Sequence, residues 1–170
     1  GSDWNAPLDA VAGGWRITFI NNWWSGQTIN MFHDLGGNYQ VSSIGPDWRG
    51  APRFRPNVIG DPVAPESQRG SPIRYLSLDT VLLPTNNVPF GSAGRNIARM
   101  PGFYQIDLAV VKDFRLPRES SALQFRAEVF NLTNKTNFQT IQPNRNNAAF
   151  GRFLTTFDPR LVQFALRLSF

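Results

Sequence analysis

The chain has 170 residues, 41% of them hydrophobic, and carries a formal net charge of +5. It has no Cys and one His, which excludes disulfides, thiolate metal sites and cysteine nucleophiles and makes a His-based metal site or a Ser-His-Asp triad hard to build. Its 17 Lys and Arg residues never form a run of three, so the positive charge predicts no nucleic-acid partner.

Alternation of apolar and polar residues with a period of two is the main structural signal. Gly and Pro, with 14 and 13 residues, interrupt almost every window long enough for a helix. No stretch approaches the roughly 18–20 consecutive apolar residues of a membrane helix. The first predicted strand covers residues 15–24, where Trp15, Ile17 and Phe19 alternate with polar residues before aromatics crowd its end.

A long connection, about residues 25–101, follows this strand and is rich in aromatic side chains. Flat rings can stack on a sugar or another flat ligand, and loops often carry function, so these rings are candidates for ligand contact. The alternative is that the rings pack the connection onto its neighbours. The candidate ligand-contacting aromatics are Trp23, Trp24, Tyr39, Trp48 and Phe54.

The same connection holds the single histidine, His33, followed by Asp34 and later by Asp47. One His with dispersed carboxylates in a Gly-rich segment makes a poor metal or acid–base site, so solvated loop residues are expected. Residues 91–96 are expected to be a flexible loop, because the strand and helix of a phosphate-binding motif are missing around them. We therefore expect no catalytic residue, no metal and no cofactor.

Two further strands, residues 104–114 and 123–130, are predicted on either side of a short polar turn around Pro117. Apolar and polar positions alternate in both, and Lys112 is the exception on the apolar face of the first. Matched alternation across such a short turn predicts that the two strands pair antiparallel.

Carboxylates lie on and beside the polar faces of these strands. They are Asp107, Asp113, Glu119 and Glu128. Two of them could be paired as in a glycosidase. Arg126 and Arg167 share the polar faces, however, and favour ion pairing inside a barrel over catalysis.

The last predicted strand runs from Val162 to the chain end, after a second long connection of about residues 131–160. One of its faces is wholly apolar and the other is polar or small. Such a strand with an aromatic end resembles the signal read by the barrel-assembly machinery, and an exposed strand edge can add to another sheet. The residues of this assembly-signal strand are Phe164, Leu166, Leu168 and Phe170.

The lengths of the connections separate two interpretations of this alternation. A soluble sandwich would bury the apolar faces in a core, whereas a membrane barrel would turn them to lipid and the charges to a wet lumen. The short turn falls on the side of the chain end and both long connections fall on the other, which is typical of outer-membrane barrels. Loops this long count against a compact soluble domain. The predicted fold class is all-β, with the antiparallel strands of a transmembrane β-barrel and long loops, in the bacterial outer membrane.

A series of motifs resembles the closing strands of TonB-dependent receptors, in particular the Oar-like type with an N-terminal carboxypeptidase-regulatory-like domain. The motifs are residues 95–103, Asp107-Leu108, residues 112–114, residues 123–134, Asn137-Phe138, residues 150–152 and residues 158–160. The resemblance covers about residues 13–170, and the order and spacing of the motifs make it specific.

The resemblance implies a barrel of about 22 strands, a plug in its lumen and energy from the TonB complex. Residues 3–170 would be the C-terminal portion of the barrel domain, and Gly1-Ser2 a cloning remnant. The implied function is nutrient uptake by the parent receptor, without catalysis. The implied partners are outer-membrane lipid, the barrel-assembly machinery, and the rest of the parent barrel or oligomer partners. The alternative function is a soluble secreted β-sandwich that binds carbohydrate or another ligand.

Overall fold

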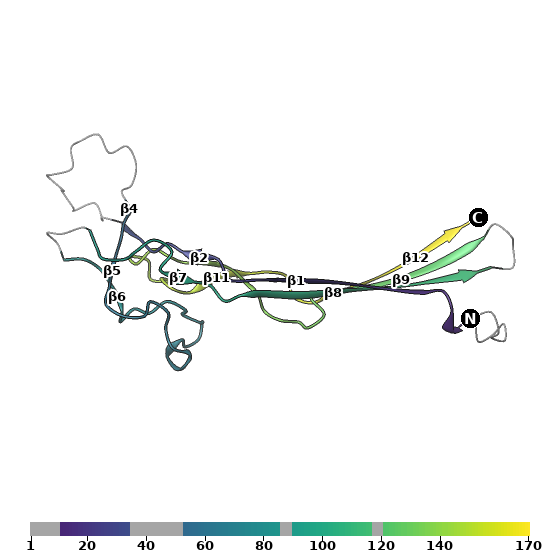
Figure 1. Ribbon diagram of the computed structural model, residues 1–170, viewed down its shortest axis with the longest axis horizontal. Coiled ribbons are helices and arrows are strands. Elements are labelled where there is room, and N and C mark those ends of the chain that lie inside the picture. Colours follow the sequence, from purple (N-terminus) through teal and green to yellow (C-terminus); the bar gives the residue numbers. More distant parts are fainter. Residues whose placement is uncertain (1–10, 35–52, 86–89, 117–120) are drawn as a thin grey trace, which may run out of the picture. The chain divides into compact units, whose positions relative to one another are not determined.

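The computed structural model describes residues 11–34, 53–85, 90–116 and 121–170 (Figure 1). The chain divides into two compact units. Unit 1 consists of Gly1–Trp24, Phe103–Asn137 and Asp158–Phe170, and unit 2 consists of Ser25–Gly102 and Phe138–Phe157. Within the described ranges, no helix is long and apolar enough to cross a membrane.

Unit 1 contains a four-stranded antiparallel sheet in the order β1-β8-β9-β12 (Figure 1). Its strands are β1 (Trp15–Trp24), β8 (Phe103–Arg115), β9 (Ala122–Phe130) and β12 (Leu161–Ser169). All four coincide with the segments that alternation predicts. The expected pairing of β8 with β9 is confirmed, with Leu108 opposite Val129, while turn residues 117–120 lie outside the described ranges.

The register aligns the apolar positions of all four strands on one face of the sheet. Ile17 lies opposite Val110, Val110 opposite Ala127, and Ala127 opposite Phe164. Residues opposite each other share a face, and the next residue along each strand points to the other face. Unit 1 therefore has an apolar face and a polar face.

The apolar face is open to its surroundings. On β12, Phe164, Leu166 and Leu168 share this face, as predicted, and are 71%, 72% and 58% exposed. Phe170 follows the strand and is 95% exposed. A sandwich would bury such residues against a second sheet. The exposure fits a lipid-facing surface and does not fit the alternative of a soluble binding module.

Lys112 is the charged exception on the apolar face, and the structure shows how its charge is accommodated. Its side chain is 2% exposed, and the ammonium group donates to the carbonyl oxygens of Gly13 and, at 3.4 Å, Val11. The nitrogen lies 5.3 Å from the ring centroids of both Trp15 and Phe114. Carbonyl groups and aromatic faces both stabilise a cation, so this lysine is compatible with a lipid-facing sheet.

Both long connections leave the same end of the sheet, as predicted. At this end Trp24 pairs with Phe103, and Leu161 pairs with Phe130. The C-terminus lies at the opposite end, beside the start of β9 (Figure 1). The arrangement of one short turn and two long connections on opposite sides is that of outer-membrane barrels.

The chain leaves β9 through a turn built on Asn131, which has a φ of 52° and is 2% exposed. Its backbone N–H donates to Asp107 Oδ1 at 2.9 Å. Its amide nitrogen donates to the carbonyls of Lys135 (3.0 Å) and Asp158 (3.3 Å), and its amide oxygen accepts the Lys135 N–H at 3.1 Å. Asn tolerates the left-handed conformation and caps the turn, so one residue ties β9 to β8 and to the segment before β12.

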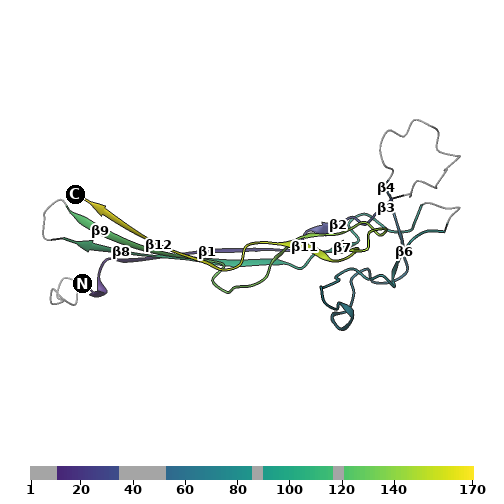
Figure 2. The same ribbon diagram turned by 180° about the vertical axis from the view of Figure 1, so that it is seen from behind.

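Unit 2 is formed by the two long connections and has a hydrophobic core of its own. The short pairs are β2 (Thr28–Ile29) with β7 (Ala98–Arg99), β3 (His33–Asp34) with β4 (Arg53–Phe54), β5 (Asn57–Val58) with β6 (Val81–Leu82), and β10 (Phe138–Ile141) with β11 (Phe153–Thr156), and η1 (Glu66–Gln68) is a 3-10 helix. The buried core residues are Ile29, Met31, Leu76, Val81, Ala98, Met100 and Phe150. Figures 1 and 2 both show β2, β7 and β11 side by side. The sequence predicted only loops here, and the structure shows packed ones.

Tyr75 joins two segments of unit 2, because its hydroxyl donates to the Arg99 carbonyl at 2.8 Å while its ring packs against the core. Burial raises the pKa of Tyr75 above its ordinary value of 10.0, Arg69 opposes the rise and Asp61 adds to it. A folded-state pKa above the unfolded value means that this stability is complete below pH 10.0 and is lost as pH rises through the folded-state pKa.

We expect Tyr75→Phe to lower the free energy of unfolding by about 1 kcal/mol at neutral pH, through loss of the hydrogen bond. The variant should also lose less stability than the parent as the pH rises above 10.0. Thermal unfolding of both proteins across neutral and alkaline pH measures the two effects. An alkaline loss of equal size in parent and variant would contradict the assignment to Tyr75.

Candidate functional site

The polar face of the unit 1 sheet carries two networks of charged and amide side chains. In the first, Arg16 Nη2 of β1 lies 2.9 Å from Asp113 Oδ2 of β8, and Gln124 Nε2 of β9 donates to Asp113 Oδ1 at 2.8 Å. Three neighbouring strands therefore contribute one side chain each to the same cluster. Adjacent polar positions in the register bring them together.

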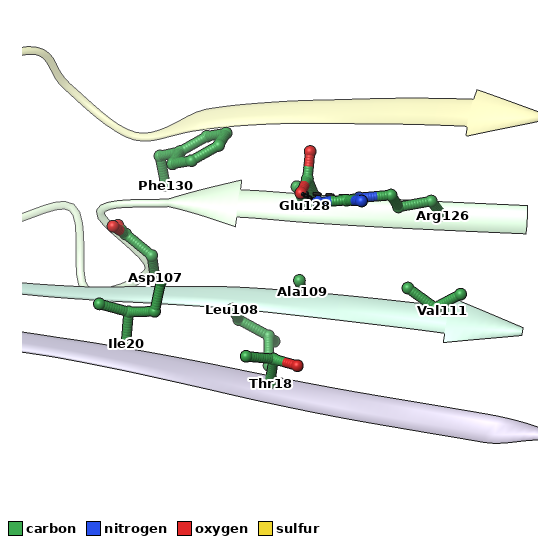
Figure 3. A pocket seen from close by; sticks show the side chains of 9 residues that line it. All are labelled: Thr18, Ile20, Asp107, Leu108, Ala109, Val111, Arg126, Glu128 and Phe130. Atoms are coloured by element: carbon green, nitrogen blue, oxygen red, sulfur yellow. Dashed lines mark hydrogen bonds and ion pairs between the residues drawn. The ribbon is translucent and has the colours of Figure 1, made fainter.

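The second network centres on Glu128 of β9. Arg126 Nε donates to Glu128 Oε1 at 2.8 Å, the other end of the same guanidinium makes an ion pair with that oxygen, and Gln163 of β12 donates to Glu128 Oε2. Figure 3 shows Arg126 and Glu128 side by side above the strand. This confirms the expected ion pairing for Glu128, which is paired with Arg126 and bonded to Gln163.

A shallow hollow of about 220 Å³ lies beside this network, with Thr18, Asp107 and Ala109 among its lining residues (Figure 3). Ligand pockets usually measure about 300–1,000 Å³, so this one is small for an organic ligand. Asp107 accepts hydrogen bonds from the Asn131 N–H at 2.9 Å and from Gln105 Nε2 at 2.8 Å. The Asp107 carboxylate thus holds the end of β9. The polar face of the unit 1 sheet resembles a charged wall that faces water.

The structure divides the described candidate ligand-contacting aromatics between its two units. Trp23 and Trp24 belong to the end of β1 in unit 1, on opposite faces, and Trp24 stacks on Phe103 with ring centroids 3.8 Å apart. Tyr39 and Trp48 lie outside the described residues. Of the five, Phe54 is the one that the structure places in a hollow of unit 2.

The hollow of unit 2 has a volume of about 590 Å³. Its lining residues are Asn30, Met31, Phe32, Phe54, Arg55, Gly94, Arg95 and Pro143. Four segments far apart in the sequence contribute to it, which is why sequence patterns did not reveal it. The signal that could have drawn attention to it is a pair of arginines, Arg55 and Arg95, each close to glycine- and proline-rich turns.

His33 and Asp34 do not form a catalytic or metal-binding pair in the described structure. His33 is 4% exposed, and its ring lies 5.9 Å from that of Phe54, so it is a buried residue and not the solvated one that was expected. Asp34 accepts from the Asn144 amide, and its N–H donates to Asn146 Oδ1 at 3.1 Å. Among the described residues, no group of three or more His, Cys, Asp or Glu side chains could hold a metal ion.

In a comparison with protein families, residues 1–163 match the family described as outer membrane beta barrel domain. The matched range contains β1, β8 and β9, the start of β12 and both long connections. No curated protein and no solved structure matches the chain.

Proposed function

Because the chain belongs to the outer-membrane β-barrel family, and is therefore a protein of the bacterial outer membrane, we propose that it forms part of the barrel wall of a TonB-dependent receptor for nutrient uptake. The observation that carries this proposal is the two-faced sheet of unit 1. Its apolar face suits lipid, and its polar face suits the wet lumen of a transport barrel.

The charge distribution supports a lumen rather than a sealed core. Arg16 and Asp113 have side chains that are 63% and 41% exposed, although they are paired. Buried ion pairs carry a large desolvation cost, whereas solvated pairs on a lumen wall do not. A hydrated interior lets such a sheet keep both signs of charge on one face.

The TonB-dependent part of the proposal rests on the resemblance of the closing segments. The motif of residues 123–134 supplies both β9 and its terminal turn, and Asn137 extends the same role by exchanging hydrogen bonds with Tyr104 at 3.0 and 2.9 Å. Long connections that fold into a unit with its own core are also what an outer-membrane receptor needs for ligand contacts outside the membrane.

The proposed partners follow from the edges and the apolar face of the sheet. Within the described residues, β1 and β12 each pair on one side only, so each presents a free edge. Such edges pair readily with further strands, here those of the rest of the barrel or of oligomer partners. The exposed row of Phe164, Leu166, Leu168 and Phe170 is proposed to contact lipid and the barrel-assembly machinery. No catalytic role is proposed.

The uptake function can be tested in the organism that encodes the chain. We expect a strain lacking this gene to leave in the medium one or more compounds that the wild type depletes, as measured by mass spectrometry of the spent medium. A strain with a disabled TonB complex should spare the same compounds. Re-introducing the gene serves as the control.

Two outcomes would count against the proposal. If the deletion strain depletes the same compounds as the wild type, the chain is not required for uptake. If it spares compounds that the TonB-deficient strain still depletes, the chain acts in a passive pore, and only the barrel interpretation survives.

A further inference from the structure

We propose that the hollow of unit 2 binds a small amphipathic oxyanion, a molecule with a carboxylate or phosphate group on a flat apolar body. This deepens the proposed receptor function by naming the chemical class of its ligand. The hollow combines two cationic side chains, Arg55 and Arg95, with an apolar floor.

Among the residues that the structure describes, no acidic side chain lines the hollow to neutralise its positive charge. Its lining contains Arg55 and Arg95 and, among the described residues, neither Asp nor Glu. Within the described ranges, Arg55 makes one long hydrogen bond, from Nη1 to the Ala93 carbonyl at 3.4 Å, which leaves its other donors available. Arg95 is exposed and makes no side-chain hydrogen bond or ion pair within the described part of the chain. Guanidinium groups bind carboxylate and phosphate in bidentate geometry, so an oxyanion matches these free donors.

The floor of the hollow is apolar and firmly held. Met31 belongs to the core of unit 2 and is 4% exposed, and Phe54 is 5% exposed. The Phe54 ring meets that of Phe90 edge-on, with centroids 5.4 Å apart, and also contacts the ring of His33. Aromatic and thioether surfaces favour flat apolar groups, so the floor selects a body that carries such a group.

The segments that carry the two arginines are tied together by backbone hydrogen bonds. The Gly91 N–H donates to the Arg55 carbonyl at 2.9 Å, and the Ala93 N–H donates to the Pro56 carbonyl at 3.0 Å. Asn30 Oδ1 accepts the Asn96 N–H at 2.9 Å, which fixes the chain next to Arg95. A preformed site loses less entropy on binding than one that must be ordered by its ligand.

The volume of the hollow, about 590 Å³, lies within the range of small-molecule sites. It is too large for inorganic phosphate alone to fill, and the apolar floor would be left uncovered by such an ion. A ligand with one or two rings and a single oxyanion would contact both the apolar floor and the two arginines.

The test uses the protein in amphipol and isothermal titration with three probes: 1-naphthoate, 1-naphthyl phosphate and the neutral 1-naphthol. We expect at least one of the anions to bind about tenfold or more tightly than 1-naphthol, as hydrogen bonds to charged groups predict. Protein-free amphipol gives the blank for each probe. Arg95→Gln and Arg55→Gln should each reduce the preference for the anion while leaving 1-naphthol binding in place.

Arg160→Gln is the matched control, because Arg160 is exposed in unit 1 and its side chain donates, among the described residues, only a long 3.5 Å hydrogen bond. It removes the same charge without touching the hollow, and it should keep the full preference. Equal binding of anions and 1-naphthol, no binding of any probe, or an equal effect of Arg160→Gln and Arg95→Gln would each overturn the proposal. None of these results bears on compound uptake by the deletion strain, so the two proposals fail separately.

Discussion

Replacing Leu166 by Arg is expected to lower the free energy of unfolding in lipid bilayers by about 2–4 kcal/mol, which is the cost of a charge near the midplane of a barrel's lipid face. Leu166 lies near the middle of β12 and is 72% exposed on the apolar face. In the folded protein, the new guanidinium group would either lose its water to the hydrocarbon or draw water into the bilayer.

The matched control is Gln163→Arg on the same strand. Gln163 lies on the polar face, directly opposite Glu128, and already donates to that carboxylate. An arginine there can replace the amide as donor, so we expect a change within about 0.5 kcal/mol, as for ordinary surface substitutions. Urea titration of the protein in phospholipid vesicles measures both variants. Equal losses for the two positions would show that the faces of the sheet are not divided between lipid and lumen.

The second large effect is expected at Asn131. Asn131→Ala removes one amide that donates to Lys135 and Asp158 and accepts from Lys135, and it places a non-Gly, non-Asn residue at a φ of 52°. Losing the hydrogen bonds of the buried Asn131 amide costs about 1–3 kcal/mol, at about 0.5–1.5 kcal/mol for each bond, and the left-handed backbone adds about 1–2 kcal/mol. We expect a total loss of about 2–5 kcal/mol.

Asn131→Gly separates the two causes, because glycine accepts the positive φ but makes none of the side-chain hydrogen bonds. Its loss should be smaller than that of Asn131→Ala by about 1 kcal/mol. The same urea titration provides the comparison. If both variants unfold like the parent, the turn after β9 contributes no stability, and the role assigned to Asn131 is wrong.

The sheet of unit 1 was predictable from the sequence because strand geometry repeats every two residues. Alternation located β1, β8, β9 and β12, and matching the apolar positions was enough to place Ile17, Val110 and Phe164 on one face. The sequence also revealed Lys112 as the charged exception on the apolar face, but it did not reveal how that charge is accommodated. The carbonyls of Val11 and Gly13 lie 101 and 99 residues away along the chain, and no periodic pattern links them to a lysine.

Unit 2 could not be predicted in the same way. Its core combines Ile29 and Met100 from the first long connection with Phe150 from the second, and none of these belongs to an alternating run. Its strands are short, so their pairing depends on tertiary contacts more than on local preference. The cationic hollow shares this origin, since tertiary contacts bring Arg55 and Arg95 to one site. Aromatic content alone made Trp23 and Trp24 candidates for ligand contact, but in the structure they form the end of β1.

The shared core of unit 2 also constrains the order in which the protein can be assembled. Ile29 and Phe150 meet in this core, so it closes only when both connections are on the same side of the membrane. For the proposed ligand contacts outside the membrane, both connections must first be translocated across the bilayer, as extended or partly folded chain. Packing of unit 2 then follows translocation of both connections, and it hinders them from moving back across the membrane.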